Sequence, residues 1–445
     1  MVRLSHTLII GTFLGLLIAV VAFFGGWSTA ATFGYTPIGV VVTTFISGSA
    51  GGATPADARQ QFAVFWDVWQ LVKQEFYHTD PLDQQRMAYG AIHGMLSSLG
   101  DDYTSFQEPD VAAQSRESMQ GRFDGIGAYI RTEKGEILID RPIKNSPALK
   151  AGLQPGDVLL KVDGEALAPL VKGLSDAEAA AKAVAKIRGP KGSSVTLTIR
   201  RPPATTTFDV TIVRDEVPLV SVYAQLLPSN VAYIQITEFK APTASELDAA
   251  LRELLPQHPR SLILDLRNNP GGFLTTAQEV LGRFYDGTAL YEQTRDGEFK
   301  ELKTIKAPAE LQIFDVPMVV LINGGSASAS EIVAGALRDR RPHTTLIGEK
   351  SYGKGSVQNV HQLRDGSSAR ITIAQWLTPN KSVIHKIGIT PEYVVPPAAD
   401  RQYNVPCTTA RPPAEGHTDC SDAQLAISIR FLVEGTVPQG QNVTR

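Results

Sequence analysis

The sequence is poor in the residue types that build metal sites and disulfide frameworks. It has only two cysteines in 445 residues, Cys407 and Cys420, and its eight histidines form no His-Glu-x-x-His motif. Two thiols cannot supply a four-thiolate zinc site or a set of cross-links. Zinc-dependent catalysis therefore has no visible ligand set, and we expect neither a metal nor an organic cofactor.

An excess of positive charge is also missing. The 42 Lys and Arg residues stand against 45 Asp and Glu residues, which gives a net charge of −3. Binding to a phosphate backbone needs a basic surface, so we do not expect a nucleic acid partner. Glycine and proline are scattered without a period, which excludes a collagen-like or low-complexity chain. The length and the 43% hydrophobic content predict a globular protein of about three domains.

Long hydrophobic runs are confined to the N-terminus. No Asp, Glu, Lys or Arg lies between Arg3 and Asp57, and residues 8–24 are almost entirely apolar. As a helix this run would span about 26 Å, close to the ~30 Å of a hydrocarbon core. A buried core helix and a cleaved secretory signal, with small residues for cleavage at 28–30, are the alternatives. We favour an uncleaved membrane anchor that, with its linker, occupies residues 1–56 and leaves the remaining chain extracytoplasmic.

The two cysteines acquire a different meaning in such a compartment. An extracytoplasmic environment permits a disulfide between Cys407 and Cys420. Two free thiols are the alternative interpretation.

The hydrophobic pattern divides the chain after the anchor into a helical region, 57–118, an α+β region, 119–214, an α/β region, 215–398, and a tail, 399–445. The first helix carries an apolar stripe that suits packing or dimerisation, so we expect a homodimer or higher oligomer. Its members are Phe62, Phe65, Trp66, Trp69, Leu71 and Val72. In the α/β region, buried apolar strands alternate with helices, which is typical of a layered α/β domain.

One segment nearly matches a phosphate-binding loop. Residues 348–355 follow a strand and approach the pattern Gly-x-x-x-x-Gly-Lys-Ser/Thr. The hydroxyl position is held by Gly355, however, and residues 356–360 have the pattern of a strand. Without a helix there is no N-terminal dipole to hold a phosphate, so we reject nucleotide binding.

A turn of small residues joins the expected strand 316–322 to the expected helix 328–338. Ser328 and Glu331 fit a capping box, which is a purely structural interpretation. The alternative is that Ser328 is a nucleophile displayed at the turn, with the amide of Ala329 directed at a developing oxyanion.

A second glycine-rich turn, Asn268 to Gly272, follows the buried strand 262–266. Adjacent glycines allow the backbone to approach a ligand and leave amides unshielded. The amide of Gly271 or Gly272 could therefore be a second oxyanion donor, although a plain strand-to-helix turn is an equal alternative.

A serine nucleophile needs a base, and no histidine lies in a recognisable setting for one. Lys354 is the candidate, because flanking glycines allow an apolar pocket to close over its amine and lower its pKa. Gln358, four residues later, could orient the amine. A Ser-Lys pair is a known variant of the serine-protease triad.

Several motifs together are similar to those of one family, the carboxy-terminal processing proteases, which are serine peptidases with an embedded PDZ domain. The resemblance covers about residues 60–397. The matching segments are Leu264–Gly272, Gly325–Ile332, Gly348-Glu349, Gly353–Gln358, Thr378-Pro379 and Gly388–Pro391, with the PDZ hallmarks Gly125–Gly127, Ser146–Asp157 and Val162–Gly164. Departures occur at Asn380-Lys381 and Glu392, and the tail after Ala398 has no clear match.

The resemblance implies a fold, a reaction and site residues. It implies a PDZ domain over 119–214 and a ClpP/crotonase-like protease domain over 215–398. By position, the nucleophile falls on Ser328, the base on Lys354, the orienting glutamine on Gln358, and the oxyanion donors on Ala329 and Gly271 or Gly272. Gly125, Ile126 and Gly127 fall on the loop that captures a peptide's terminal carboxylate, and Arg188 on a residue that couples the two domains.

The function implied is therefore a membrane-tethered, extracytoplasmic serine endopeptidase that binds protein C-termini through its PDZ domain. A non-catalytic peptide-binding scaffold with a decayed protease domain is the main alternative. An acyl-thioester enzyme of related topology is a third hypothesis, but it has no use for a PDZ domain. We also expect peptide binding to the PDZ domain to gate activity.

Overall fold

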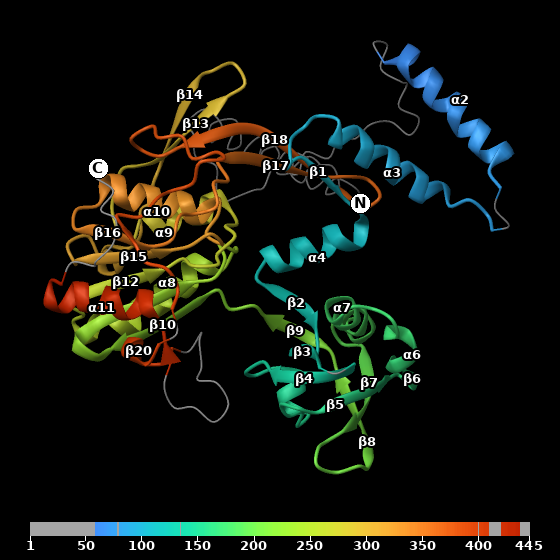
Figure 1. Ribbon diagram of the computed structural model, residues 1–445, viewed down its shortest axis with the longest axis horizontal. Helices are drawn as coiled ribbons and strands as arrows, with labels where there is room; N and C mark the ends of the chain where they lie inside the picture. The colour runs from blue at the N-terminus through green and yellow to red at the C-terminus, as the bar shows by residue number, and fades with distance from the viewer. Residues whose placement is uncertain (1–57, 78–79, 134, 399, 409–419, 437–445) are drawn as a thin grey trace, which may run out of the picture.

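The computed structural model describes residues 58–77, 80–133, 135–398, 400–408 and 420–436 (Figure 1). The expected anchor and linker, residues 1–56, lie outside the described residues. Among the helices of the described ranges, none is long and apolar enough to span a bilayer.

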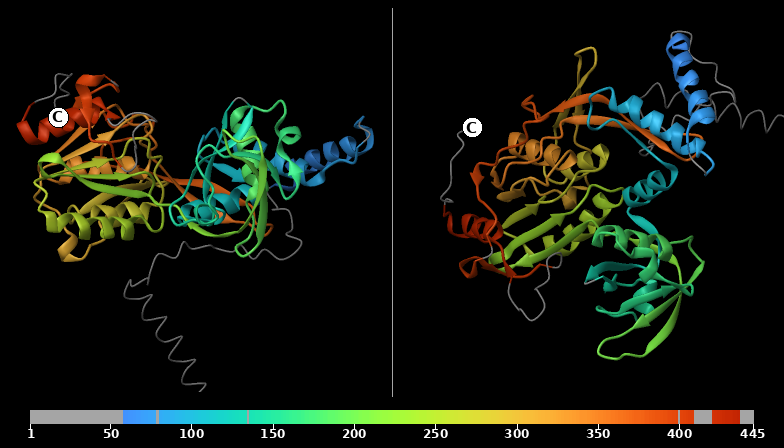
Figure 2. Two further views of the ribbon diagram at one scale, coloured as in Figure 1. Left: turned by 90° about the horizontal axis from the view of Figure 1, so that it is seen from below. Right: turned by 45° about the vertical axis from the view of Figure 1, so that its right-hand side comes forward.

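The first described region contributes helices and one strand. Its elements are α2 (Arg59–Glu75), α3 (Gln84–Ser97), β1 (Ser105–Gln107) and α4 (Pro109–Met119). The helix carrying the apolar stripe, α2, stands apart from the rest of the chain in every view, and none of its residues is buried (Figures 1 and 2). The strand β1 was not expected from the local pattern, and it pairs with β18, far away in the sequence.

The PDZ module is inserted between two short strands that pair with each other. The connection consists of β2 (Arg122–Gly125) and β9 (Asp215–Pro218), which run antiparallel. The module's sheet has the order β3-β4-β5-β7-β8, with β6 paired to β5. Its strands and helices are β3 (Ala128–Glu133), β4 (Glu136–Pro142), α5 (Pro147–Lys150), β5 (Val158–Val162), β6 (Glu165–Ala166), α6 (Leu167–Val171), α7 (Asp176–Ile187), β7 (Ser194–Arg200) and β8 (Thr207–Val213).

The module has its own hydrophobic core, formed by the sheet and α7. Ile139, Val195 and Leu197 are among its buried members, and Ala183 of α7 packs against them. A capping box between Ser175 and Glu178 starts α7. A module with a separate core can fold independently. Its position relative to the protease region therefore depends on the short β2–β9 connection.

The α/β region is built on a six-stranded sheet of order β10-β11-β12-β15-β16-β19. β10 is antiparallel to β11, and the remaining pairs are parallel. Its strands and helices are β10 (Val222–Leu227), β11 (Val231–Ile236), α8 (Thr243–Leu254), β12 (Ser261–Asp265), α9 (Leu274–Leu281), β15 (Met318–Ile322), α10 (Ala329–Arg340), β16 (Thr344–Gly348) and β19 (Tyr393–Val394). Every residue of β12 and β15 is buried, as expected for parallel strands that are covered on both faces.

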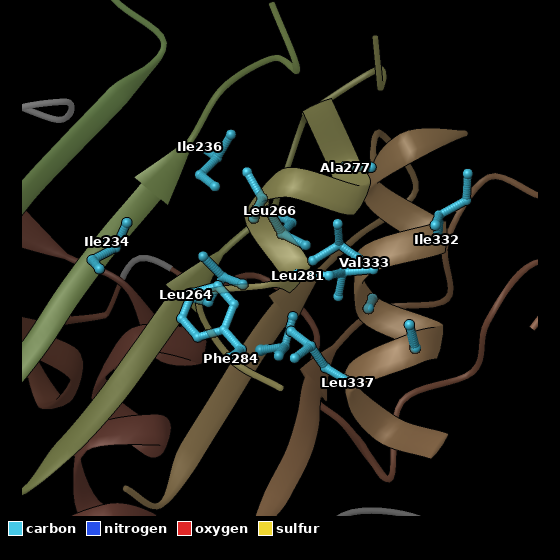
Figure 3. Packing of buried hydrophobic residues seen from close by; sticks show 14 of the residues in the cluster. Ile234, Ile236, Leu264, Leu266, Ala277, Leu281, Phe284, Ile332, Val333 and Leu337 are labelled. Atoms are coloured by element: carbon cyan, nitrogen blue, oxygen red, sulfur yellow. The ribbon is translucent and has the colours of Figure 1, made fainter. Parts of the chain in front are cut away.

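Helices cover the sheet on both sides, which the left-hand view of Figure 2 shows. One face carries Ile234, Leu264 and Val320, which pack with residues of α8, α9 and α10. Figure 3 shows this packing, with Phe284 and Leu337 closing the interior. The opposite face packs against α11 (Ala423–Glu434) of the C-terminal region. The expected layered α/β domain is confirmed.

A second sheet projects from this layer toward α3 and β1 (Figures 1 and 2). It contains β13 (Thr288–Thr294), β14 (Phe299–Lys303), β17 (Ser356–Gln362) and β18 (Ser368–Leu377), together with β1. Because β17 is a strand, the prediction that no helix follows the Gly348–Gly355 segment is confirmed. Four short 3₁₀ helices complete the described elements: η1 (Pro228–Asn230), η2 (Leu255–Gln257), η3 (Ala309–Leu311) and η4 (Arg401–Tyr403).

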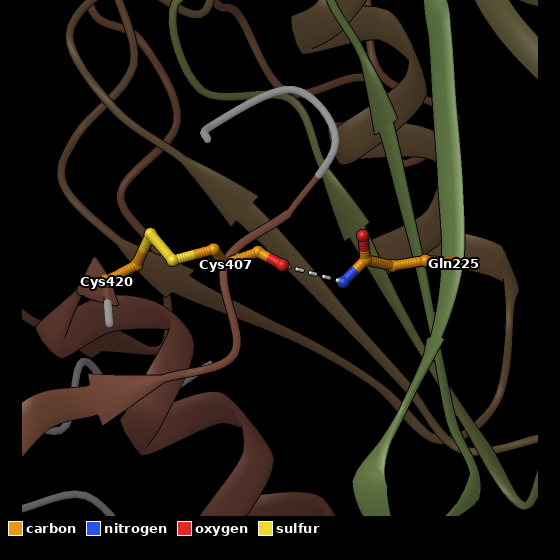
Figure 4. Close-up of a disulfide and its surroundings, with 3 residues drawn as sticks. All are labelled: Gln225, Cys407 and Cys420. Carbon is orange, nitrogen blue, oxygen red and sulfur yellow. Dashed lines mark hydrogen bonds between the residues drawn. A yellow bond between two sulfur atoms is a disulfide. The ribbon is translucent and has the colours of Figure 1, made fainter. Parts of the chain in front are cut away.

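The C-terminal region is fastened to the α/β layer in two ways. Cys407 and Cys420 form a disulfide, which decides between the two alternatives, beside the short hairpin of β20 (Asn404–Val405) and β21 (Cys420–Ser421). The carbonyl of Cys407 accepts a hydrogen bond from Gln225 of β10, as Figure 4 shows. In addition, the buried guanidinium of Arg267 pairs with Asp265 and with Asp422 at the start of α11.

Candidate active site

The predicted catalytic and oxyanion residues all line one cleft of about 490 Å³. They are Gly271, Gly272, Ser328, Ala329, Lys354 and Gln358. The cleft lies at the carboxyl ends of β12 and β15, where loops of an α/β sheet commonly bind ligands. Residues of α4 and of β17 and β18 form its other walls.

Ser328 occupies a sharp strand-to-helix turn. β15 ends at Ile322, α10 begins at Ala329, and Ser328 between them has φ 55° and ψ −116°. A non-glycine residue in this region is strained, and such strain is concentrated at functional sites. The amide of Ser328 donates to Oε2 of Glu331 at 2.9 Å, so the expected capping pair is present. Capping therefore shapes the turn that displays Ser328 in the cleft.

The glycine turn lies directly against Ser328. A Cβ atom at Gly271 would lie 2.7 Å from Cβ of Ser328, and one at Gly272 would lie 2.1 Å from the carbonyl oxygen of Phe239. Both glycines also have positive φ, 105° and 144°. Only glycine fits these two positions, because a side chain would collide with the neighbouring backbone or with Ser328.

The buried side chain of Asn269 fixes this turn. Its Nδ2 donates to the carbonyl of Ile236, and its Oδ1 accepts from the amide of Gly271. Its carbonyl accepts from the amide of Ala327 at 3.0 Å, which joins the glycine turn to the serine turn. In the described part of the chain, the amides of Gly272 and Ala329 have no acceptor. These two amides are thus available to a ligand in the cleft, whereas that of Gly271 is already bonded.

Lys354 lies in a loop that packs tightly because of its flanking glycines. A Cβ atom at Gly353 would lie 2.9 Å from the amide of Gly388, and one at Gly355 would lie 2.5 Å from the amide of His385. Burial lowers the pKa of Lys354, and the positive charge of Arg370 lowers it further. Asp101 and Glu331 act in the opposite direction. The outcome favours the neutral amine that a base must present.

Glu331 joins the serine turn to the lysine loop. Its carboxylate is fully buried and accepts four hydrogen bonds: from the amides of Ser328 and Lys354 at Oε2, and from Ser351 Oγ and the amide of Gly353 at Oε1. The sequence signalled Glu331 only as a capping residue. Its long-range contacts could not be read from local spacing.

Gln358 lies on β17 and faces the cleft. Its Nε2 donates to Ser356 Oγ at 2.8 Å and to Thr372 Oγ1 at 3.3 Å. Its carbonyl oxygen therefore remains the atom that can accept from the amine of Lys354. That contact stays a prediction.

Tyr103 is a residue of this site that the sequence analysis missed. Its ring lies 5.2 Å from Nζ of Lys354 and 6.0 Å from the ring of His385. Burial and a hydrogen bond with Tyr352 raise the pKa of Tyr103 to about 12, so the phenol stays neutral. Thr104 next to it accepts from the amide of Thr372 on β18. The segment before the PDZ module thus forms part of the wall around the base.

The predicted peptide-binding loop of the PDZ module lines a separate pocket of about 210 Å³, which also contains residues of α7. The amides of Ile126 and Gly127 have no acceptor among the described residues. The neighbouring β3 is an edge strand of the sheet, so a peptide could extend it. Arg188, at the end of α7, lies 3.8 Å from Glu117 of α4 and covers the ring of Phe123.

Comparison with known proteins assigns a protease domain and a PDZ domain to the same two regions as the sequence does. The model of peptidase family S41 matches residues 230–395, and a PDZ-domain model matches residues 138–201. Carboxy-terminal processing protease CtpA of Bacillus subtilis (strain 168) is 38% identical over 355 residues, which cover 79% of this chain and 73% of that protein. CtpB of the same organism is 38% identical over 331 residues, covering 74% of this chain and 66% of that protein.

Among solved structures, the photosystem II D1 C-terminal processing protease aligns at 29% identity with a TM-score of 0.43, covering 74% of this chain and 86% of that chain. The family-model matches and the two Bacillus relatives confirm the resemblance found in the sequence. The chain belongs to the carboxy-terminal processing proteases, a group of serine-type peptidases in family S41.

Proposed function

We propose that this protein is a membrane-tethered, extracytoplasmic endopeptidase that cleaves peptide bonds with Ser328 as nucleophile and Lys354 as base. The observation that carries this proposal is the shared cleft, which is lined by the strained Ser328, the half-buried Lys354 and two free amides. Burial in this cleft lowers the pKa of Lys354 and so favours the neutral amine that the reaction needs.

In the first half of the reaction, the amine of Lys354 takes the hydroxyl proton of Ser328 while Oγ attacks the scissile carbonyl. The negative charge that develops on the carbonyl oxygen is stabilised by the amides of Gly272 and Ala329. Lys354 then gives its proton to the leaving amine, and an acyl-enzyme remains on Ser328. In the second half, Lys354 activates a water molecule that hydrolyses this ester. Gln358 accepts a hydrogen bond from the amine and orients it.

The substrates are proteins whose C-termini bind the PDZ module. Free amides at Ile126 and Gly127 can hold the terminal carboxylate while the peptide pairs with β3. The contact between Arg188 and Glu117 links this pocket to α4, which forms a wall of the catalytic cleft. Peptide binding therefore gates the cleft by shifting the position of α4.

Two pairs of variants test the catalytic assignment. Ser328→Ala and Lys354→Ala should each lose at least about 10³-fold in kcat on an unstructured protein substrate, because each removes a reacting group. Ser245→Ala and Lys350→Ala are matched controls on exposed positions and should keep the wild-type rate. Circular dichroism and thermal unfolding would establish that all four variants are folded. Wild-type cleavage by either Ser328→Ala or Lys354→Ala would contradict the assignment.

The apolar residues 8–24 support the tether. The full chain should float with phospholipid vesicles in a density gradient, and a chain starting at residue 57 should not. Co-flotation of the shortened chain would contradict the proposal. The proposal would also be contradicted if the expressed full chain were recovered in a cleaved form that lacks its first 30 residues.

The exposed face of α2 supports a homodimer. Phe62, Phe65, Trp69 and Val72 of α2 recur at heptad spacing, and none of them is buried in the monomer. The helix carries two basic and two acidic residues, so a second copy of α2 adds no net repulsion. Replacing Phe65 and Trp69 with Gln should convert a dimer to a monomer in sedimentation experiments. A wild-type monomer at micromolar concentration would overturn this part.

A further inference from the structure

Arg370 lies in the catalytic cleft, and the role given to it so far is only that its charge lowers the pKa of Lys354. It belongs to β18, where it pairs across the sheet with Val360 of β17 and Ser105 of β1. Its side chain lines the same cleft as Ser328, Lys354 and Gln358. The second sheet thus places a guanidinium next to the bond that is cleaved.

This guanidinium is unusual in having no partner. The Nε atom of Arg370 is buried without a hydrogen bond, and its side chain forms no ion pair with any residue of the described ranges. Other shielded arginines in the described ranges have acceptors. Arg201, Arg267 and Arg283 bind carboxylates, and Arg214 and Arg341 bind backbone carbonyls. A half-buried arginine without such a partner is costly, because its five donors need acceptors.

The cleft itself offers no carboxylate to Arg370. Among the described residues, Glu238 is the only acidic side chain that lines the cleft, and it lies 3.1 Å from Lys240. Glu331 does not line the cleft, and both of its oxygens accept hydrogen bonds from the serine and lysine loops. A carboxylate of the substrate can therefore supply the acceptor that the described residues do not provide.

We infer that Arg370 is a specificity-determining residue that binds a carboxylate of the substrate close to the scissile bond. This inference rests on the proposed function of the cleft. A planar guanidinium binds a carboxylate through two parallel hydrogen bonds, which a neutral amide cannot match. The carboxylate is either an Asp or Glu side chain flanking the scissile bond or the terminal carboxylate of a chain that ends inside the cleft.

Matched peptides separate these sources. One series places Glu or Gln at each of the three positions on either side of the scissile bond, and a second compares a free C-terminal acid with its amide. Wild-type kcat/KM should be about 10-fold or more higher for at least one acidic member than for its neutral partner. A Glu-over-Gln preference identifies a side chain, and an acid-over-amide preference identifies the C-terminus.

The variants decide whether Arg370 is the cause. In Arg370→Gln the acidic-over-neutral preference, measured on the high-pH plateau of each enzyme, should fall to about 1, and Arg370→Lys should keep part of it. Loss of the positive charge also raises the pKa of Lys354, so cleavage of the neutral peptide by Arg370→Gln should be slower below that plateau. Arg364→Gln, an exposed position near the end of the same strand pair, is the matched control. The PDZ module can also favour a free acid over an amide, but this contribution would be equal in the wild type and in Arg370→Gln. The ratio of the two enzymes' acid-over-amide preferences therefore measures the contribution of the cleft alone.

Equal preferences in the wild type and Arg370→Gln at every position would overturn the inference, and so would loss of the preference in Arg364→Gln. If Arg370→Gln does not fold, Arg370→Lys must still show a reduced preference. Failure of the wild type to cleave any of these peptides would instead contradict the proposed function, so the two failures are distinguishable.

Discussion

Ser328 and Lys354 donate their backbone amides to the same atom, Oε2 of Glu331, at 2.9 and 2.8 Å. The two turns that carry the proposed nucleophile and base are therefore held together by one buried carboxylate. This arrangement explains how a flexible lysine side chain can start from a fixed point near Ser328. It also makes Glu331 a positioning residue, because its oxygens accept hydrogen bonds from three backbone amides and from Ser351 Oγ.

Replacing Glu331 with Gln should lower kcat by about 10²-fold or more with a much smaller change in KM. An amide has one acceptor oxygen and adds two donors, so at least one of the four bonds is lost and an N–H faces an N–H. Each orphaned buried donor costs about 1–3 kcal/mol, so the melting temperature should also fall. Glu253→Gln, on the exposed side of α8, is the control. A Glu331→Gln enzyme with wild-type kcat would show that the shared carboxylate does not position the site.

The glycine turn gives a second prediction. Gly271→Ala should reduce kcat strongly, because its methyl group would press against Cβ of Ser328 at 2.7 Å. Gly272→Ala should in addition destabilise the fold, since the contact is with the backbone of Phe239. Steady-state kinetics and urea unfolding would measure the two effects.

Gly297→Ala is a control that separates the effect of a steric collision from the effect of a positive φ angle. Gly297 has φ 79°, but a Cβ atom there would meet no atom within 4 Å. This variant should show only the cost of the positive φ, roughly 1 kcal/mol, and keep full activity. If Gly271→Ala were as active as Gly297→Ala, the close approach of the turn to Ser328 would not matter for catalysis.

Much of the scaffold of this site can be predicted from local sequence. The strands that became β12 and β15 are short apolar runs, and the helix that became α10 starts at a capping pair, so both signals lie within a few residues. The same holds for the two turns that carry Gly272 and Ser328. Lys354 was proposed as the base for Ser328 from its flanking glycines, and the resemblance to a family implied the same pairing.

The site residues that could not be predicted from the sequence depend on contacts between distant segments of the chain. Tyr103 is placed beside Lys354 only because β1 pairs with β18. In the sequence, Arg370 is indistinguishable from an ordinary strand residue. Only the structure shows that its buried Nε has no hydrogen-bond partner. The apolar stripe of α2 was read correctly as a helix, but its exposure could not be foreseen, because a hydrophobic face does not reveal whether its partner is in the same chain.

The pH dependence of activity should follow Lys354. Only the neutral amine can accept the Ser328 proton, so kcat/KM should rise with pH and level off above the pKa of Lys354. Because burial and Arg370 lower this pKa from 10.5, the plateau should begin below the range of an ordinary lysine. A pH profile of kcat/KM with a neutral peptide would measure it.

Asp101→Asn provides the control for that assignment. The negative charge of Asp101 raises the pKa of Lys354, so its removal should move the acid limb to lower pH. The exposed variant Asp102→Asn should leave the limb closer to its wild-type position. A limb that does not move in Asp101→Asn, or that moves to higher pH, would indicate that another group controls the profile.

The contact between Arg188 and Glu117 tests the proposed gating. Both side chains are partly exposed, so the pair adds little to stability, and its loss should alter regulation without unfolding the protein. Arg188→Glu and Glu117→Arg should each weaken the activation of cleavage by a non-cleavable peptide that occupies the PDZ pocket. The double variant, which restores opposite charges, should recover part of that activation. Basal cleavage of a short peptide measured in parallel would show that the cleft is intact.

Two outcomes would contradict the gating proposal. If both single variants respond to the peptide like the wild type, the link through α4 does not carry the signal. If removal of residues 121–213 also leaves the kinetics unchanged, the PDZ module does not gate the cleft at all.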